Sequence, residues 1–168
     1  MKYFATLILA GICTAWLFEA RGEQLSAPRS TNSDVVIFSS FQVDTANGWL
    51  HSIEKPASGD WGELIIFHHP EGVGTLKVRS LVAPEIVSRD DLRNMTNVDS
   101  ALQLTFKRWG DYTGFQHDYL EKDSFFRQWW LANESTIIFI TYSCGIEFKE
   151  IENQQINDIV RSLKINTP

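Results

Sequence analysis

The sequence predicts one α+β domain, in which helices pack on a twisted and largely antiparallel sheet. Segments rich in β-branched and aromatic residues outnumber the helical segments, the connections between them are short, and the helical segments are separated from the strands. The chain has 168 residues, and a single domain typically takes about 100–200 residues. We therefore expect one globular domain.

The first 22 residues are typical of a secretory signal peptide. Lys2 is the only charged residue before Glu19, and the sixteen residues between them are mainly apolar. This run is shorter than the roughly 20 residues that a membrane-spanning helix needs. A small-x-small pattern at 20–22 predicts cleavage after residue 22, and an uncleaved membrane anchor is the alternative. The expected location is the bacterial periplasm or cell envelope.

The charge balance argues against a nucleic-acid partner. The chain has 15 Lys and Arg residues and 21 Asp and Glu residues, so its formal net charge is −6, and Lys107-Arg108 is the only basic dipeptide. A protein that neutralises phosphates needs a basic surface. Cleavage after residue 22 would leave Cys144 as the one cysteine, which excludes an intramolecular disulfide. The membrane is an expected partner only through an uncleaved signal segment.

Strands dominate the predicted domain. A polar linker at 23–34 precedes it, and we place the domain itself at 35–168. Five short runs in the first half predict strands at 35–38, 41–43, 49–53, 63–68 and 75–81. Asn47-Gly48 predicts a tight turn before the third of them. Three further strands are expected in a meander at 115–121, 125–131 and 136–142. Residues 100–107 are also predicted as a strand, and an extension of the helix that precedes them is the alternative.

Two helices are expected to pack on opposite faces of this sheet. Ser88 is a suitable N-cap that is followed by acidic residues, so a short helix begins there. Apolar residues recur near helical spacing in the segment 147–163, with Glu and Asn opposite them. This pattern predicts an amphipathic C-terminal helix.

Five segments, in order along the chain, resemble those of a known family. They are FQVDTANGW at 41–49, GFQHDY at 114–119, FRQWWL at 126–131, FITYSC at 139–144 and IVRSLKI at 159–165. The family is the PsbP/Mog-type superfamily, which includes the DcrB-like bacterial envelope proteins. The resemblance covers about residues 36–166 and implies an α/β/α sandwich. It implies no catalytic residues and no cofactor, since the members are mostly non-enzymatic binding or accessory proteins.

The expected function is that of an exported, non-catalytic binding or accessory protein whose partner is another protein. Large aromatic residues are enriched at binding surfaces, and many of them lie at 109–130, beside a glycine-containing loop at 109–114. The residues expected to contact the partner are Trp109, Asp111, Tyr112, Phe115, Trp129 and Trp130. A narrower alternative is a periplasmic immunity protein that neutralises a secreted toxin.

A small hydrolase that uses Cys144 with His117 or His51 is an alternative of another class. A cysteine nucleophile needs a base beside it, and no known nucleophile motif surrounds Cys144. The adjacent His68 and His69 point to opposite faces of a strand, so they cannot jointly hold a metal ion. The sequence therefore predicts no catalytic, cofactor-binding or metal-binding residue.

Overall fold

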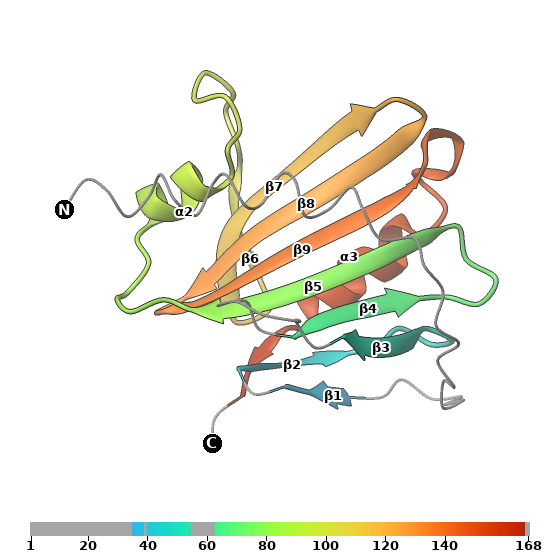
Figure 1. Cartoon of the computed structure of the whole chain (residues 1–168), viewed down its shortest axis with the longest axis horizontal. Coiled ribbons are helices and arrows are strands. Elements are labelled where there is room, and N and C mark those ends of the chain that lie inside the picture. Colours follow the sequence, from blue (N-terminus) through green and yellow to red (C-terminus); the bar gives the residue numbers. More distant parts are fainter. Residues whose placement is uncertain (1–34, 39, 55–62, 167–168) are drawn as a thin grey trace.

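The computed structural model describes residues 35–38, 40–54 and 63–166, so the predicted signal segment and linker lie outside the described residues. Within this part of the chain, seven strands form one antiparallel sheet in the order β3-β4-β5-β9-β8-β7-β6, and three form a small sheet in the order β1-β2-β10 (Figure 1). The predicted α+β class is confirmed.

The element bounds are as follows. The strands are β1 (Val35–Ile37), β2 (Phe41–Asp44), β3 (Leu50–Glu54), β4 (Leu64–His68), β5 (Gly74–Val82), β6 (Phe106–Trp109), β7 (Tyr112–Glu121), β8 (Ser124–Asn133), β9 (Thr136–Gly145) and β10 (Lys164–Ile165). The helices are α2 (Arg89–Met95), the single-turn 3-10 helix η1 (Ile146–Phe148) and α3 (Asn153–Arg161). None of the described helices is long and apolar enough to cross a membrane.

Different elements cover the two faces of the large sheet. Ile138 and Ile140 of β9 point to one face, where they belong to a core that includes apolar residues of α3 and of the small sheet. Ile137 and Phe139 point to the other face and share a second core with Leu92 of α2. Figure 1 shows α3 behind the strands and α2 at one end of the sheet. We name these the helix face, which α3 covers, and the open face, which α2 covers only in part.

The prediction of a strand over 100–107 is wrong for most of that segment, because β6 begins only at Phe106. The guanidinium group of Arg93 donates to the carbonyl oxygens of Asp99 and Leu102, at 2.9 and 3.0 Å. These bonds hold the segment to the end of α2 as a loop. The three meander strands are present, and each is longer than predicted.

The C-terminal helix is shorter than the predicted span of 147–163, because the residue before it turns inward. Glu152 is 3% exposed. Its carboxylate accepts hydrogen bonds from the Tyr142 hydroxyl at 2.8 Å and from the Val73 N–H at 3.2 Å. These bonds join the start of α3 to β9 and to the loop between β4 and β5, and burial raises the pKa of Tyr142. The preceding residues form η1 and turns instead of a longer helix.

A two-residue turn joins β6 to β7, where the sequence predicts an adaptable loop. Trp109 pairs with Tyr112, so only Gly110 and Asp111 lie outside the ladder. Gly110 has a φ of 60°, which glycine adopts without steric cost. The Asp111 N–H donates to the carbonyl oxygen of Leu163 at 2.9 Å. The turn is thereby fixed against the segment that follows α3.

Tyr112 makes the stability of the fold sensitive to alkaline pH. Its buried hydroxyl donates to the carbonyl oxygen of Ser40 at 3.2 Å. Burial, with a smaller contribution from the charge of Asp111, raises the pKa of Tyr112 from 10.0 to about 12. Since the folded protein holds this proton more tightly than the unfolded chain, the stabilisation is complete below pH 10 and is lost between pH 10 and 12.

Between pH 10 and 12, the free energy of unfolding should fall less steeply with pH in Tyr112→Phe than in the wild-type protein. The expected difference in slope is about 1.4 kcal/mol per pH unit, which is the value of one titrating proton. Urea unfolding of both proteins at several pH values between 9 and 12 measures this difference. Equal slopes for the two proteins would contradict the burial of this hydroxyl.

Candidate functional site

Five of the six residues that the sequence predicts as partner contacts are buried. The exposed fraction is 5% for Trp109 and Trp130, 3% for Phe115, and 0% for Tyr112 and Trp129. The expectation that these aromatic side chains form an exposed surface is therefore wrong.

The physical reason is that the part of β8 that carries Trp129 and Trp130 is covered on both faces. Trp129 points to the helix face, where its ring lies edge-on to Trp109 at 5.9 Å between centroids. Trp130 points to the open face, under α2, and its ring lies 4.2 Å from that of Phe139. Asp111, the sixth predicted contact, is partly exposed, and its carboxylate accepts a hydrogen bond from a backbone N–H of β10 at 3.2 Å.

Cys144 is separated from the histidines that could have served as its base. It is buried on the helix face, and burial raises the pKa of its thiol, which disfavours the thiolate. His117 lies on the open face, because it pairs with Gln128, which in turn pairs with Thr141. His51 lies on β3, and β4 and β5 separate that strand from β9. The strand pairing therefore places neither His117 nor His51 beside this thiol.

His68, the last residue of β4, and His69, which follows it, have different surroundings. His68 lies on the open face as the partner of Thr75, whereas the Nδ1 atom of His69 accepts a hydrogen bond from the Glu71 N–H at 3.2 Å. Among the described residues, no group of three or more His, Cys, Asp or Glu side chains could hold a metal ion.

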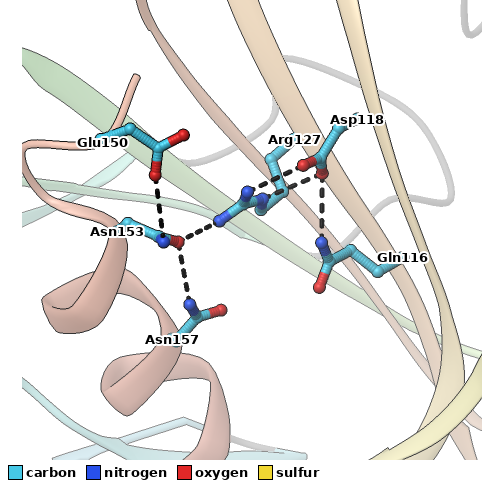
Figure 2. A network of polar contacts seen from close by, with 6 residues as sticks. All are labelled: Gln116, Asp118, Arg127, Glu150, Asn153 and Asn157. Carbon is cyan, nitrogen blue, oxygen red and sulfur yellow. Dashed lines mark hydrogen bonds and ion pairs between the residues drawn. The ribbon is translucent and has the colours of Figure 1, made fainter. Parts of the chain in front are cut away.

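A polar network joins α3 to the sheet on the helix face (Figure 2). Arg127 of β8 donates to both carboxylate oxygens of Asp118 on β7, at 2.9 and 2.7 Å. Its third contact is the side-chain oxygen of Asn153, which also accepts from Asn157 at 3.0 Å. The guanidinium side chain is only 12% exposed. Because these groups satisfy one another, we assign the network to the attachment of α3 and not to ligand binding.

The part of the open face that α2 does not cover carries polar, cationic and aromatic side chains. Cross-strand pairing places ten of them on the same side of the sheet: His68, Thr75, Lys77, Arg79, His117, Tyr119, Phe126, Gln128, Thr141 and Ser143. We call these ten residues the polar platform. Nine of the ten are partly exposed, and Thr141 at the centre is buried.

Three rings of the platform stack on one another. The ring centroids of Tyr119 and Phe126 are 5.0 Å apart with planes at 9°, and those of His117 and Tyr119 are 5.7 Å apart with planes at 16°. The Gln128 side chain donates to the Tyr119 hydroxyl at 3.2 Å. The stack is therefore already ordered, so contact with another molecule would cost these side chains little conformational entropy.

The feature of the sequence that could have indicated the platform is the set of polar residues at alternate positions of the strand at 74–82. Lys77 and Arg79 alternate there with the buried residues Leu76 and Val78. This alternation predicts a strand with one exposed face, but it does not show which strands lie beside it. The sequence-based prediction favoured the aromatic region and missed these residues.

A cleft of about 370 Å³ beside α2 is a weaker candidate. Its lining carries the cations Arg89 and Arg108 together with the anions Asp111 and Glu134. The Arg89 guanidinium lies 4.9 Å from the centroid of the Phe106 ring. Because this lining carries charges of both signs, its charge indicates no particular class of ligand. We therefore take the polar platform as the candidate functional site.

No protein-family model and no curated protein matches this sequence. Solved structures with a similar fold include a protein of Bacteroides thetaiotaomicron VPI-5482, with a TM-score of 0.56 and 11% identity over 76% of this chain and 45% of that chain. They also include the cyanobacterial PsbP (CyanoP) of Synechocystis sp. PCC 6803, with a TM-score of 0.54 and 16% identity over 89% of this chain and 99% of that chain. LpqN, which is involved in cell envelope biogenesis of Mycobacterium tuberculosis, matches with a TM-score of 0.43 and 11% identity over 70% of this chain and 84% of that chain.

The resemblance to PsbP-type proteins that the sequence segments predict is confirmed as a shared fold. This chain spans nearly the whole cyanobacterial PsbP but less than half of the Bacteroides protein. At 11–16% identity the likeness concerns the fold, and one fold serves many functions.

Proposed function

We propose that this chain is an exported, non-catalytic binding protein of the bacterial cell envelope, and that it binds a partner protein through the polar platform. The observation that carries the proposal is that, among the described elements, α2 covers only part of the open face, beside an ordered set of aromatic and hydrogen-bonding side chains. The sequence pattern of the first 22 residues supports export. The shared fold with cyanobacterial PsbP agrees with a binding role but does not decide it.

The two other functions considered from the sequence have less support. A hydrolase would need a base beside Cys144, and the described histidines that were candidates lie on the other face or on a distant strand. The immunity-protein alternative depends on the acidic net charge and on exposed aromatic residues at 109–130, and the main aromatic residues there are buried. We therefore keep the broader proposal.

Site-specific photo-crosslinking in living cells tests this function. The photoreactive residue p-benzoylphenylalanine replaces Gln128 on the platform in one variant and Gln154, an exposed residue of α3, in the matched control. We expect a heavier adduct in the envelope fraction from position 128 and none from position 154. Adducts only from position 154, or from neither position, would count against the platform as the binding surface. N-terminal sequencing of the same fraction should show a chain that begins after residue 22.

A further inference from the structure

We propose that two copies of this chain associate edge to edge through the outer side of β7, around a two-fold axis at Tyr119. This inference goes beyond the proposed function, because it concerns a second copy of the chain and not a different partner. Three observations carry it: the open edge of β7, the point at which β6 ends, and the complementary side chains that this pairing brings opposite one another.

The outer edge of β7 is only partly paired. β8 pairs with β7 from Thr113 to Glu121, whereas β6 pairs with it only up to Phe115. Within the described part of the chain, no strand lies beside residues 116–121 on that side, and Figure 1 shows this end of β7 at the border of the sheet. The backbone at this edge can therefore pair with another strand.

The backbone groups of alternate residues point outward along this edge. In an antiparallel strand, the N–H and C=O groups of successive residues point alternately to the two neighbours. Tyr112 closes the two-residue turn with β6, so its groups point to the β6 side. By this alternation, the groups of Gln116, Asp118 and Leu120 point to the same side, beyond the end of β6. A strand that approaches this edge meets a regular row of donors and acceptors.

The edge lacks the features that usually prevent another strand from adding. Natural sheets protect an edge with a proline, a lysine or a bulge. Residues 116–121 contain no proline, glycine or lysine, and their pairing with β8 is continuous. The carboxylate of Asp118 is held by Arg127 of the neighbouring strand. The charge of this residue is thereby compensated within its own sheet.

The end of β6 fixes the register of the pairing. An axis at residue 118 would bring Glu121 of the second copy beside Phe115, where β6 already lies. An axis at Tyr119 avoids β6 and still pairs residues 117–121 of both copies. An axis further along β7 would pair fewer residues. The register around Tyr119 therefore buries the longest stretch of the open edge.

The side chains that this register brings together are complementary. On the open face, His117 of each copy lies directly across from Glu121 of the other copy, and both side chains are at least partly exposed. These are non-hydrogen-bonded pairs, whose Cα atoms are about 4.5 Å apart, so their side chains can contact each other. An imidazole N–H donates to a carboxylate, and the contact becomes an ion pair when the imidazole is protonated. The two-fold axis forms this pair twice.

The association joins two polar platforms into one surface. The two-fold axis of an antiparallel pair is perpendicular to the sheet, so the open faces of both copies point to the same side. His117 and Tyr119 of the platform lie along the shared edge. A partner with two matching sites would therefore bind the dimer more tightly than it binds a single copy.

Sedimentation velocity of the exported chain over a range of concentrations tests the association. We expect a reversible monomer–dimer equilibrium. Glu121→Lys should raise the dissociation constant of the dimer about tenfold, because both symmetry-related pairs with His117 lose their attraction. The control Glu85→Lys makes the same charge change at an exposed position off β7 and should change the constant less than about twofold. The double variant His117→Glu with Glu121→Lys restores opposite charges, so its constant should lie within about threefold of the wild-type value.

Cysteine crosslinking tests the register. Across the axis, the Cα atoms of the two Tyr119 residues are about 4.5 Å apart, whereas those of the two Leu120 residues are about 8–9 Å apart. A disulfide needs a Cα separation below about 7 Å. Oxidation should therefore give a covalent dimer of Tyr119→Cys. Leu120→Cys should give none, although Leu120 is 58% exposed.

Other results overturn the inference. A monomer at every concentration would exclude the association. A dimer that Glu121→Lys and Glu85→Lys weaken equally, or that neither weakens, would belong to another surface. Equal crosslinking at both cysteine positions would reject the register. If circular dichroism shows that Glu121→Lys does not fold, Glu121→Gln replaces it, and a wild-type dissociation constant in that variant would exclude the pairing.

This proposal and the proposed function can fail separately. The mass of an adduct at position 128 distinguishes a second copy of the chain from a different protein. A monomeric chain that still forms an adduct with a different protein would reject the dimer and keep the proposed function. A dimer without such an adduct would keep the edge pairing and reject the platform as the binding surface.

Discussion

Trp129→Ala is expected to lower the free energy of unfolding by about 3–5 kcal/mol, the usual cost of removing a large buried aromatic side chain. Trp129 is fully buried on the helix face, and its ring lies edge-on to Trp109 at 5.9 Å. The substitution removes apolar contacts on a central strand and leaves a cavity between the sheet and α3. Urea unfolding at neutral pH, followed by circular dichroism, measures the loss.

The matched control is Phe126→Ala on the same strand. Phe126 lies on the open face, is partly exposed, and contacts Tyr119 through ring stacking. An aromatic pair of this kind contributes about 0.5–1.5 kcal/mol beyond its buried area, so the expected loss is about 1–2 kcal/mol. A loss for Phe126→Ala as large as that for Trp129→Ala would contradict the assignment of the two faces of β8.

Gly110→Ala should cost about 3 kcal/mol or more. Gly110 has a φ of 60°, and an alanine there carries a backbone penalty of about 1–2 kcal/mol. A Cβ atom at this position would also lie 1.9 Å from the carbonyl oxygen of Leu163. Since that neighbour is backbone, the turn must move away and lose the hydrogen bond from the Asp111 N–H, which is worth about 1 kcal/mol. Thermal and urea unfolding measure the effect.

Gly145→Ala is the control for this prediction. Gly145 has a φ of −62°, which any residue adopts, and the atom nearest to a Cβ at this position would be in the movable side chain of Phe148, at 3.1 Å. Its expected cost is below about 1 kcal/mol. Similar costs at the two positions would mean that the β6–β7 turn does not depend on a positive φ.

Local patterns explain why so much of the fold could be predicted. The cap at Ser88 depends on a residue three positions later, and its Oγ accepts from the Asp91 N–H at 3.1 Å. Strand alternation depends on residues two positions apart, so eight runs were recognised as strands. The segment at 100–107 was misassigned because a side chain from outside it, Arg93, decides its conformation.

The candidate site could not be predicted in the same way, because burial depends on what covers each face. The sequence shows that Trp129 and Trp130 point to opposite sides of a strand, but not that α3 covers one side and α2 the other. For this reason, aromatic residues that lie in the core are expected at the surface when only the sequence is considered.

The sequence by itself determined the α+β class, the position of most strands, the start of α2 and the likeness to PsbP-type proteins, because these follow from short-range periodicity and from the order of segments. Only the tertiary structure decided which side chains share the open face. Lys77 and Thr141 pair across β5 and β9, although they lie far apart in the chain, and neither residue predicts the other. The polar platform exists because long-range strand pairing places such residues on one face and because α2 is too short to cover it.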